Sequence, residues 1–158
     1  MNAHRAEAVL LTGVYGSGKS SVAEEIAYLL EQRCERYALL DLDYLSWAGS
    51  GTSDRASEFA LMLTNLAAVA GNYRSAGEVQ GVREALGLPL RVARLTVRLP
   101  EIERRLASDV TSGRRDDLRA AAASIAAAEG TGVEDVVISN DRPIGVVARD
   151  VMTFLGWL

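Results

Sequence analysis

The sequence contains a single lysine, and that lysine lies in a motif that strongly restricts the fold. Residues 13–20 read GVYGSGKS, which fits the pattern G-x-x-x-x-G-K-[ST] of a phosphate-binding loop with Lys19 as its lysine. The other sixteen basic residues are all arginines. An ammonium group can reach the β- and γ-phosphates of a nucleotide inside a tight loop, where the broader guanidinium would not fit. The motif therefore predicts a nucleotide-phosphate site.

The residues around the motif follow the order that such a loop requires, which is strand, loop and helix. Residues 8–12 are apolar and predict a buried strand, and residues 20–33 repeat apolar side chains at helical spacing. The loop thus ends at a helix N-terminus, where unpaired N–H groups favour anions. We expect Ser20 to bind Mg2+ and Ser21 to contact the α-phosphate. The residues expected to hold the nucleotide phosphates are Gly13, Tyr15, Gly16, Ser17, Gly18, Lys19, Ser20 and Ser21.

The composition limits the class of protein. A chain of 158 residues of which 49% are apolar can build its own core, so we expect one domain over residues 1–158. The net charge of −4 gives no general attraction to nucleic acid or to anionic membranes. No apolar run is long enough to span a bilayer, and no signal peptide precedes the first strand. We therefore expect a cytoplasmic protein without a nucleic-acid or membrane partner.

The chain has one cysteine and one histidine, and both restrict its chemistry. Cys34 cannot form an internal disulfide, which suits the cytosol, and we expect it to be a small buried residue of the first helix. His4 lies in the N-terminal tail. This position argues against a histidine base, a Ser-His-Asp triad or a zinc site, so any general base is expected to be a carboxylate.

Predicted strands alternate with predicted helices along the rest of the chain. Further strands are expected at residues 37–42, 90–97 and 133–139. Further helices are expected from Asp54 or Ser57 through Leu66, over residues 78–86, over 101–109 with Pro100 at the first turn, over 116–129 and over 143–155. This alternation predicts an α/β fold, with a doubly wound parallel sheet between two layers of helices.

Two aspartates follow the predicted strand at residues 37–42. Ligands of open α/β sheets bind beyond the carboxyl ends of the strands, where Asp41 and Asp43 would stand. Side chains two apart on an extended strand point the same way, so this pair could organise Mg2+, with Asp41 as a metal ligand, and accept the proton of a substrate hydroxyl. The alternative is that both are turn-forming aspartates that cap a loop.

Four arginines flank a break near Gly113, and they suggest a flap over residues 109–117. An arginine that closes over the γ-phosphate would stabilise charge on the transferred group, and Arg114 or Arg115 is placed for that role. Arg104 and Arg105 point about 100° apart on a helix, so we do not expect both of them to act on the phosphate. The alternative for each is a solvated charge that balances nearby carboxylates.

A loop that follows the last predicted strand carries the sequence NDRP at residues 140–143. This loop lies at the same edge of the sheet and could pack against adenine, with Arg142 over the base and Pro143 beside it. Asp141 is also expected to cap the helix that begins at Pro143.

With these motifs in this order, the chain resembles the small P-loop kinases of the adenylylsulfate kinase, gluconate kinase and shikimate kinase branch. The resemblance covers nearly the whole chain, and its most specific part is residues 13–20. It implies a five-stranded parallel sheet of order 2-3-1-4-5, ATP as donor with Mg2+, and a small-molecule acceptor. It also implies phosphate and Mg2+ binding by residues 13–21, an acidic pair at Asp41 and Asp43, a lid arginine at Arg114 or Arg115, and an adenine loop at Arg142. Adenylylsulfate kinases have DGDN where this chain has DLDY at residues 41–44.

Residues 66–70 decide whether the third strand of that sheet exists. Leu63, Leu66, Val69 and Tyr73 keep a helical period, which favours a helix through Tyr73. A strand at residues 66–70 is the alternative. If the segment is helical, the strand next to the phosphate-loop strand is missing from this sequence.

Two functions fit these features. The first is an ATP-binding phosphotransferase that moves the γ-phosphate of ATP to a hydroxyl group of a small molecule. The second is a nucleotide-binding regulator or degenerate kinase without useful turnover. A GTPase is excluded because the guanine-reading motif Asn-Lys-x-Asp needs a second lysine.

Overall fold

The computed structural model describes residues 8–46, 55–75, 90–107, 119, 122–123, 125 and 134–158. The chain divides into two compact units, which are described separately below. One consists of Met1–Ile26 with Arg91–Leu158, and the other consists of Ala27–Leu90.

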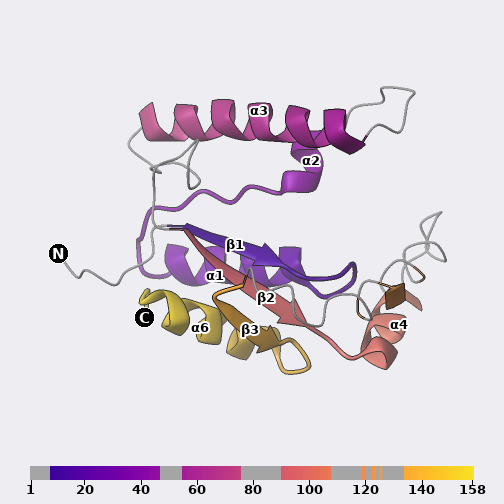
Figure 1. Ribbon diagram of the computed structural model, residues 1–158. Coiled ribbons are helices and arrows are strands. Elements are labelled where there is room, and N and C mark those ends of the chain that lie inside the picture. The colour runs from indigo at the N-terminus through magenta and orange to yellow at the C-terminus, as the bar shows by residue number, and fades with distance from the viewer. Residues whose placement is uncertain are drawn as a thin grey trace. The chain divides into compact units, whose positions relative to one another are not determined.

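The first unit is built on a sheet whose described strands are β1 (Ala8–Thr12), β2 (Leu90–Thr96) and β3 (Val136–Ser139), in the order β1-β2-β3 (Figure 1). Strands β2 and β3 are parallel, with Ala93 opposite Val136 and Thr96 opposite Ser139. Ala93 and Leu95 are buried, as alternate residues on one face of a strand should be. The three strands match strands 1, 4 and 5 of the predicted order, so the predicted α/β fold with a parallel sheet is confirmed.

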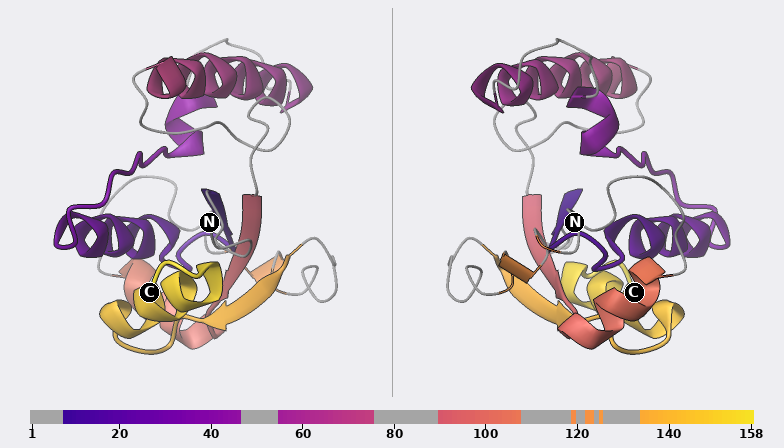
Figure 2. Two further views of the ribbon diagram at one scale, coloured as in Figure 1. Left: turned by 90° about the vertical axis from the view of Figure 1, so that its left-hand side faces the viewer. Right: turned by 90° about the vertical axis from the view of Figure 1, so that its right-hand side faces the viewer.

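Helices α1 (Lys19–Glu31), α4 (Leu99–Ala107) and α6 (Ile144–Leu155) follow the three strands in turn (Figure 2). Each begins close to its sequence prediction, and Pro100 lies in the first turn of α4, where its missing N–H is harmless. Helix α6 buries one complete face, formed by Val147, Ala148, Val151, Met152 and Leu155. These buried residues recur at three- and four-residue steps, which places them on one face of a helix and explains why the C-terminal segment packs as one.

A small hydrophobic cluster joins the phosphate loop to α4. Val97 and Ile102 are buried, and Val14, Leu106 and Ile125 pack against them. Because Val14 belongs to the loop and Leu106 to α4, the loop and this helix have a fixed relation within the first unit. Ile125 is helical, as are the other described residues of the predicted helix over 116–129.

In the second unit, helix α3 (Arg55–Ser75) settles the ambiguous segment, because residues 66–70 are helical. The favoured prediction is therefore confirmed, and the alternative strand is wrong. Ser57 lies inside α3 and so is not its cap, whereas Asp54 lies outside the described residues. A short helix, α2 (Leu42–Ser46), precedes α3, and Asn65 of α3 donates a hydrogen bond to the carbonyl oxygen of Leu45 at 2.7 Å.

The strand predicted over residues 37–42 is wrong. Residues 35–41 have no regular secondary structure, and α2 begins at Leu42. The backbone N–H of Asp43 donates to Oδ1 of Asp41 at 3.0 Å, so Asp41 caps the first turn of α2. Leu39 is 45% exposed, whereas the strands of a parallel sheet with helices on both faces have buried apolar side chains. This local cap favours a helix where the apolar residues alone suggested a strand.

Cys34 is exposed, so the prediction that it is buried is also wrong. Its φ angle is 55°, and its N–H donates to the carbonyl oxygen of Glu31 at 2.9 Å. It therefore occupies the left-handed position that closes the end of α1, a position where glycine is usual. Chain reversal at this point turns the side chain outward.

The helix predicted over residues 78–86 and the flap over 109–117 lie outside the described residues. Among the residues that the structure does describe, no helix is both long enough and apolar enough to cross a membrane.

Candidate functional site

The phosphate loop has the backbone conformation that its sequence predicts. Gly13, Gly16 and Gly18 have φ angles of 144°, 76° and 86°, which side chains other than hydrogen rarely allow. The N–H of Ser17 donates to the carbonyl oxygen of Val14 at 3.1 Å and closes a turn inside the loop. The glycines of the motif are therefore required by the path of the chain.

Gly13 is also the point at which the loop touches the sheet. A Cβ atom at this position would lie 2.5 Å from the carbonyl oxygen of Leu95 in β2 and 2.7 Å from Oγ of Ser17. Both neighbours are held in place, since Leu95 is a buried strand residue and Ser17 is fully buried. The loop and β2 can approach this closely only at a glycine.

We therefore expect Gly13→Ala to destabilise the protein by at least about 2 kcal/mol, because the positive φ and the collision with backbone each cost energy. For a chain of this size that loss corresponds to a fall in Tm of about 4–8 °C. Gly145→Ala is the matched control, since this glycine lies in α6 and its added Cβ would meet side-chain atoms, of which the nearest is Oε1 of Glu25 at 3.1 Å. Thermal unfolding of the two variants checks the prediction, and equal Tm values would contradict it.

Lys19 is folded back over the loop. Its Nζ donates to the carbonyl oxygens of Gly13 at 3.1 Å and Val14 at 3.3 Å. Lys19 stands at the end of the phosphate loop, and its ammonium group reaches back to the first two residues of that loop. Ser20 and Ser21 follow Lys19 in the first turn of α1. The role predicted for Lys19 at the nucleotide phosphates stays a prediction.

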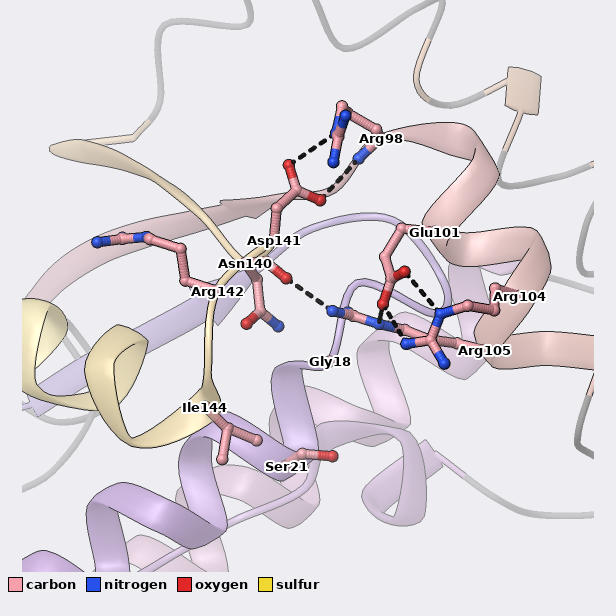
Figure 3. A pocket seen from close by; sticks show the side chains of 10 residues that line it. All are labelled: Gly18, Ser21, Arg98, Glu101, Arg104, Arg105, Asn140, Asp141, Arg142 and Ile144. Atoms are coloured by element: carbon pink, nitrogen blue, oxygen red, sulfur yellow. Dashed lines mark hydrogen bonds and ion pairs between the residues drawn. The ribbon is translucent and has the colours of Figure 1, made fainter.

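A cavity of about 490 Å3 opens beside the phosphate loop (Figure 3). Its lining comes from three parts of the first unit: the start of α1, the segment from β2 into α4, and the loop from β3 into α6. The lining residues are Gly18, Ser21, Arg98, Glu101, Arg104, Arg105, Asn140, Asp141, Arg142 and Ile144. Four arginines face two carboxylates in this set, so the cavity suits an anionic ligand.

Glu101 organises two of these arginines. One of its carboxylate oxygens accepts from Arg104 at 2.6 Å and from Arg105 at 2.8 Å, and the other accepts from Arg104 at 2.8 Å. The hydrogen bonds from Arg104 and then Arg105 lower the pKa of Glu101 to about 2, and Glu101 in turn raises the pKa of Arg104. Glu101 and Arg104 therefore both stay ionised near neutral pH.

Arg105 is the arginine of α4 that turns toward the phosphate loop. Its guanidinium donates to the carbonyl oxygens of Asn140 at 2.7 Å and Ser17 at 3.5 Å. The Arg105 side chain is 27% exposed, whereas that of Arg104 is 72% exposed. The prediction that these two arginines do not both act stays a prediction. Arg114 and Arg115, which were predicted to act from the flap, lie outside the described residues.

The loop after β3 lines the cavity, and its predicted contact with adenine stays a prediction, but Asp141 does not cap α6. The N-cap position is Pro143, and no side chain caps the helix there. The carboxylate of Asp141 instead accepts hydrogen bonds from the Arg98 side chain at 3.3 Å and the Ser139 hydroxyl at 3.1 Å. Asp141 thus pairs with the segment after β2 and does not cap the helix that follows it.

Arg142 lies in the cavity wall with its guanidinium already paired. Its Nη2 contacts Oδ2 of Asp150 at 2.7 Å and donates to the carbonyl oxygen of Ser139 at 3.3 Å. Pro143 follows directly and leads into α6. These contacts give Arg142 a defined position beside the cavity.

Asp41 and Asp43 belong to the second unit, and both are exposed. The expectation that they point the same way from a strand is wrong, because Asp41 caps α2 and Asp43 lies in the first helical turn. No group of three or more histidine, cysteine, aspartate or glutamate side chains forms a metal cage among the described residues. The predicted catalytic and metal roles of the pair stay predictions.

Sequence reasoning did not single out Arg98, Glu101 or Asn140 as parts of this site. The i,i+4 spacing of Glu101 and Arg105 was a visible signal, but it indicates only a helical ion pair. The contacts of Arg105 with Ser17 and Asn140 join residues far apart in the sequence. The sequence contains no local signal for them.

Comparisons by sequence identify no relative: no protein-family model matches the chain, and no curated protein matches it. Solved structures do match. A sugar kinase from Janibacter sp. HTCC2649 is 18% identical, with a TM-score of 0.68 and coverage of 96% of this chain and 95% of that chain. A gluconokinase from Sinorhizobium meliloti 1021 is 20% identical, with a TM-score of 0.63 and coverage of 97% and 93%. The APS kinase of Mycobacterium tuberculosis, solved with AMPPNP and APS, is 20% identical, with a TM-score of 0.57 and coverage of 96% and 98%.

These similarities extend over nearly the full length of each protein, and at such identities they establish the fold alone. They confirm the resemblance inferred from the motifs. The chain therefore has the fold of the small P-loop kinases.

Proposed function

We propose that this protein is a kinase that transfers the γ-phosphate of ATP to a hydroxyl group of a small molecule. The observation that carries the proposal is the position of an arginine-lined cavity directly beside a phosphate loop whose lysine is already turned into the loop. A nucleotide needs both features, because its phosphates and its base must bind at neighbouring places.

In this proposal the phosphates of ATP lie in the loop from Gly13 to Ser21. Lys19 exchanges its hydrogen bonds to loop carbonyls for contacts with the β- and γ-phosphates. The backbone N–H groups at the start of α1 contribute further donors, and the helix dipole favours the anion. The positive charge is thereby concentrated where the transferred group develops negative charge.

Ser20 fits a role as Mg2+ ligand, because it offers a hard oxygen and is exposed in the first turn of α1. Magnesium in such sites is held by one or two protein oxygens together with substrate phosphates and water, so a dedicated cage of carboxylates is not required. When bound, Mg2+ would neutralise charge on the phosphates. Asp41 is the second ligand that we propose for this ion.

The base and ribose would occupy the cavity between α4 and the loop after β3. Its volume of about 490 Å3 lies in the range typical of small-ligand pockets. The pairing of Arg142 with Asp150 holds the guanidinium plane in place, so it can form one wall against adenine without first being ordered. Pro143 fixes the backbone beside it.

The acceptor hydroxyl needs a base, and a carboxylate is the available chemical type. We assign this role to Asp43, with Asp41 as the alternative. Arg114 or Arg115 would close over the γ-phosphate from the flap and stabilise charge in the transition state. The acceptor itself is a small molecule with a free hydroxyl group.

A second candidate function is ATP binding without useful turnover, as in a regulator or a degenerate kinase. One observation favours it: residues 35–41 are not a strand, so Asp41 and Asp43 do not follow a strand of the sheet as they would in an active member of this fold. Nucleotide binding by the first unit would be unaffected.

Nucleotide binding and ADP release separate the two candidates. Thermal shift with ATP, ADP and GTP should show stabilisation by the adenine nucleotides. ADP release should then be measured with a panel of hydroxylated acceptors, beginning with gluconate, sugars, shikimate and adenylylsulfate, which are suggested by the neighbours in fold. Acceptor-dependent ADP release supports the kinase. Binding of ATP with no acceptor-dependent release across the panel supports the second candidate, and absence of any nucleotide binding contradicts both.

A further inference from the structure

The peptide group between Ser17 and Gly18 is held from outside the phosphate loop. Nδ2 of Asn140 donates to the carbonyl oxygen of Ser17 at 2.7 Å. Nη1 of Arg105 approaches the same oxygen at 3.5 Å. Figure 3 shows Asn140 and Arg105 meeting close to Gly18 at the floor of the cavity.

Asn140 is itself firmly placed. It is only 3% exposed, and its backbone N–H donates to the carbonyl oxygen of Thr96 at the end of β2, at 2.8 Å. Its own carbonyl oxygen accepts from Arg105 at 2.7 Å. Each polar group of the Asn140 backbone is thus engaged, and the side-chain amide is presented to the loop from a rigid support.

The close approach depends on Gly18. A Cβ atom at Gly18 would lie 2.5 Å from Nδ2 of Asn140, so no other residue would let the amide reach the Ser17 carbonyl. Gly18 is therefore required for the contact with the loop after β3 as well as for the turn of the phosphate loop itself.

A trans peptide is planar, so its C=O and N–H groups point in opposite directions. Since Asn140 and Arg105 hold the C=O of Ser17 on one side, the N–H of Gly18 must point away from them. We propose that Asn140, assisted by Arg105, is a positioning residue that fixes this peptide so that the Gly18 N–H is ready to donate to a nucleotide phosphate. The inference rests on the proposed nucleotide site and adds a residue that acts on it without touching the ligand.

The contacts of Asn140 and Arg105 with the carbonyl oxygen of Ser17 form a clamp on the peptide between Ser17 and Gly18. This clamp reduces how far the phosphate loop must rearrange when a phosphate binds. An unclamped peptide next to a glycine can rotate, and the loop would have to order it at the expense of binding energy. These contacts also connect the phosphate loop to the loop after β3 and to α4, and both of these line the cavity.

Asn140→Leu tests the proposal, because leucine keeps the branched shape of asparagine and removes the amide, including the Nδ2 donor to Ser17. We expect the affinities for ATP and for inorganic tripolyphosphate to fall about three- to tenfold, which is the effect of one lost hydrogen bond. Affinity for adenosine should stay within about twofold of the native value, because adenosine carries no phosphate that the Gly18 N–H could bind. In the unliganded variant, the amide resonance of Gly18 should move, because its peptide has lost a hydrogen bond.

Asn65→Leu is the matched control. Asn65 also donates from Nδ2 to a backbone carbonyl, that of Leu45, at the same distance of 2.7 Å, but it lies in α3 of the second unit. This control should lower Tm and leave the tripolyphosphate affinity at the native value. Asn140→Ala replaces Asn140→Leu if the larger side chain prevents folding.

Three results would overturn the inference. Native affinity for tripolyphosphate in a folded Asn140→Leu variant would show that the clamp has no role in phosphate binding. An equal loss of affinity for tripolyphosphate and adenosine would show a general collapse of the cavity. Failure of the native protein to bind either ATP or tripolyphosphate would overturn the nucleotide site as well, whereas the first two results leave that site intact.

Discussion

Lys19→Ala is expected to lower phosphoryl transfer by at least about 10²–10³-fold, which is the usual effect of removing one preorganised charge stabiliser. ATP affinity should fall as well, because Lys19 is the only lysine in the chain and its ammonium group lies against the carbonyl oxygens of Gly13 and Val14 in the phosphate loop. The fold should survive. The two hydrogen bonds that are lost go to partly exposed loop carbonyls, so the free energy of unfolding should fall by no more than about 1–2 kcal/mol.

Two further variants show whether the effect belongs to the ammonium group. Lys19→Arg keeps the charge but replaces a compact ammonium by a planar fork, and it should lose most of the activity too. Arg149→Ala removes a cation from α6, outside the cavity lining, and should behave like the native protein. Calorimetric ATP binding and ADP release measure both effects. Unchanged affinity and turnover in Lys19→Ala would contradict the phosphate-loop assignment.

The parts of the site that could be predicted are those with local causes. The positive φ angles of Gly13, Gly16 and Gly18 follow from the motif alone, and the lysine position follows from the loop. Strand β1 and helix α6 are likewise visible as an apolar run and as a helical repeat. In each case the residues that carry the signal are neighbours in the sequence.

The strand prediction at residues 37–42 was wrong because two local signals in this segment disagree. The apolar residues favour a strand, but Asp41 is a strong helix N-cap and Asp43 suits the first turn of a helix. A strand also needs partners in a sheet, and periodicity gives no information about partners. The alternative interpretation of these aspartates was a pair that caps a loop, whereas Asp41 caps a helix.

The contacts of Arg105, Asn140 and Asp141 could not be predicted, because they depend on the packing of distant elements. Arg105 meets Ser17 across 88 residues of sequence, and Asn140 meets Ser17 across 123. Asp141 had an obvious local role as a helix cap, yet it pairs with Arg98 at the end of β2. The parallel register of β2 and β3 brings these two positions together, and that register is a property of the folded sheet.

Asp43→Asn is expected to lower phosphoryl transfer about 10²–10⁴-fold, which is the usual contribution of a general base, while ATP affinity changes little. The base acts on the acceptor hydroxyl, so it contributes to the transition state and not to binding of the donor. Asp43 lies in the first turn of α2 and is exposed. Loss of its charge from that turn should cost only about 0.3–1 kcal/mol of stability. Single-turnover kinetics with the acceptor identified by ADP release, together with calorimetric ATP binding, separate the rate from the affinity.

Asp41→Asn provides the comparison that isolates chemistry from structure. Asparagine caps a helix as well as aspartate does, so α2 should keep its first turn when only the charge of Asp41 is removed. If Asp41 binds Mg2+, this variant should need a higher Mg2+ concentration for half-maximal rate, whereas Asp43→Asn should not. If Asp41 is the base instead, the large loss of rate moves to Asp41→Asn. Native turnover in both variants would show that the two aspartates serve only to start α2, and that the acceptor is activated by another group.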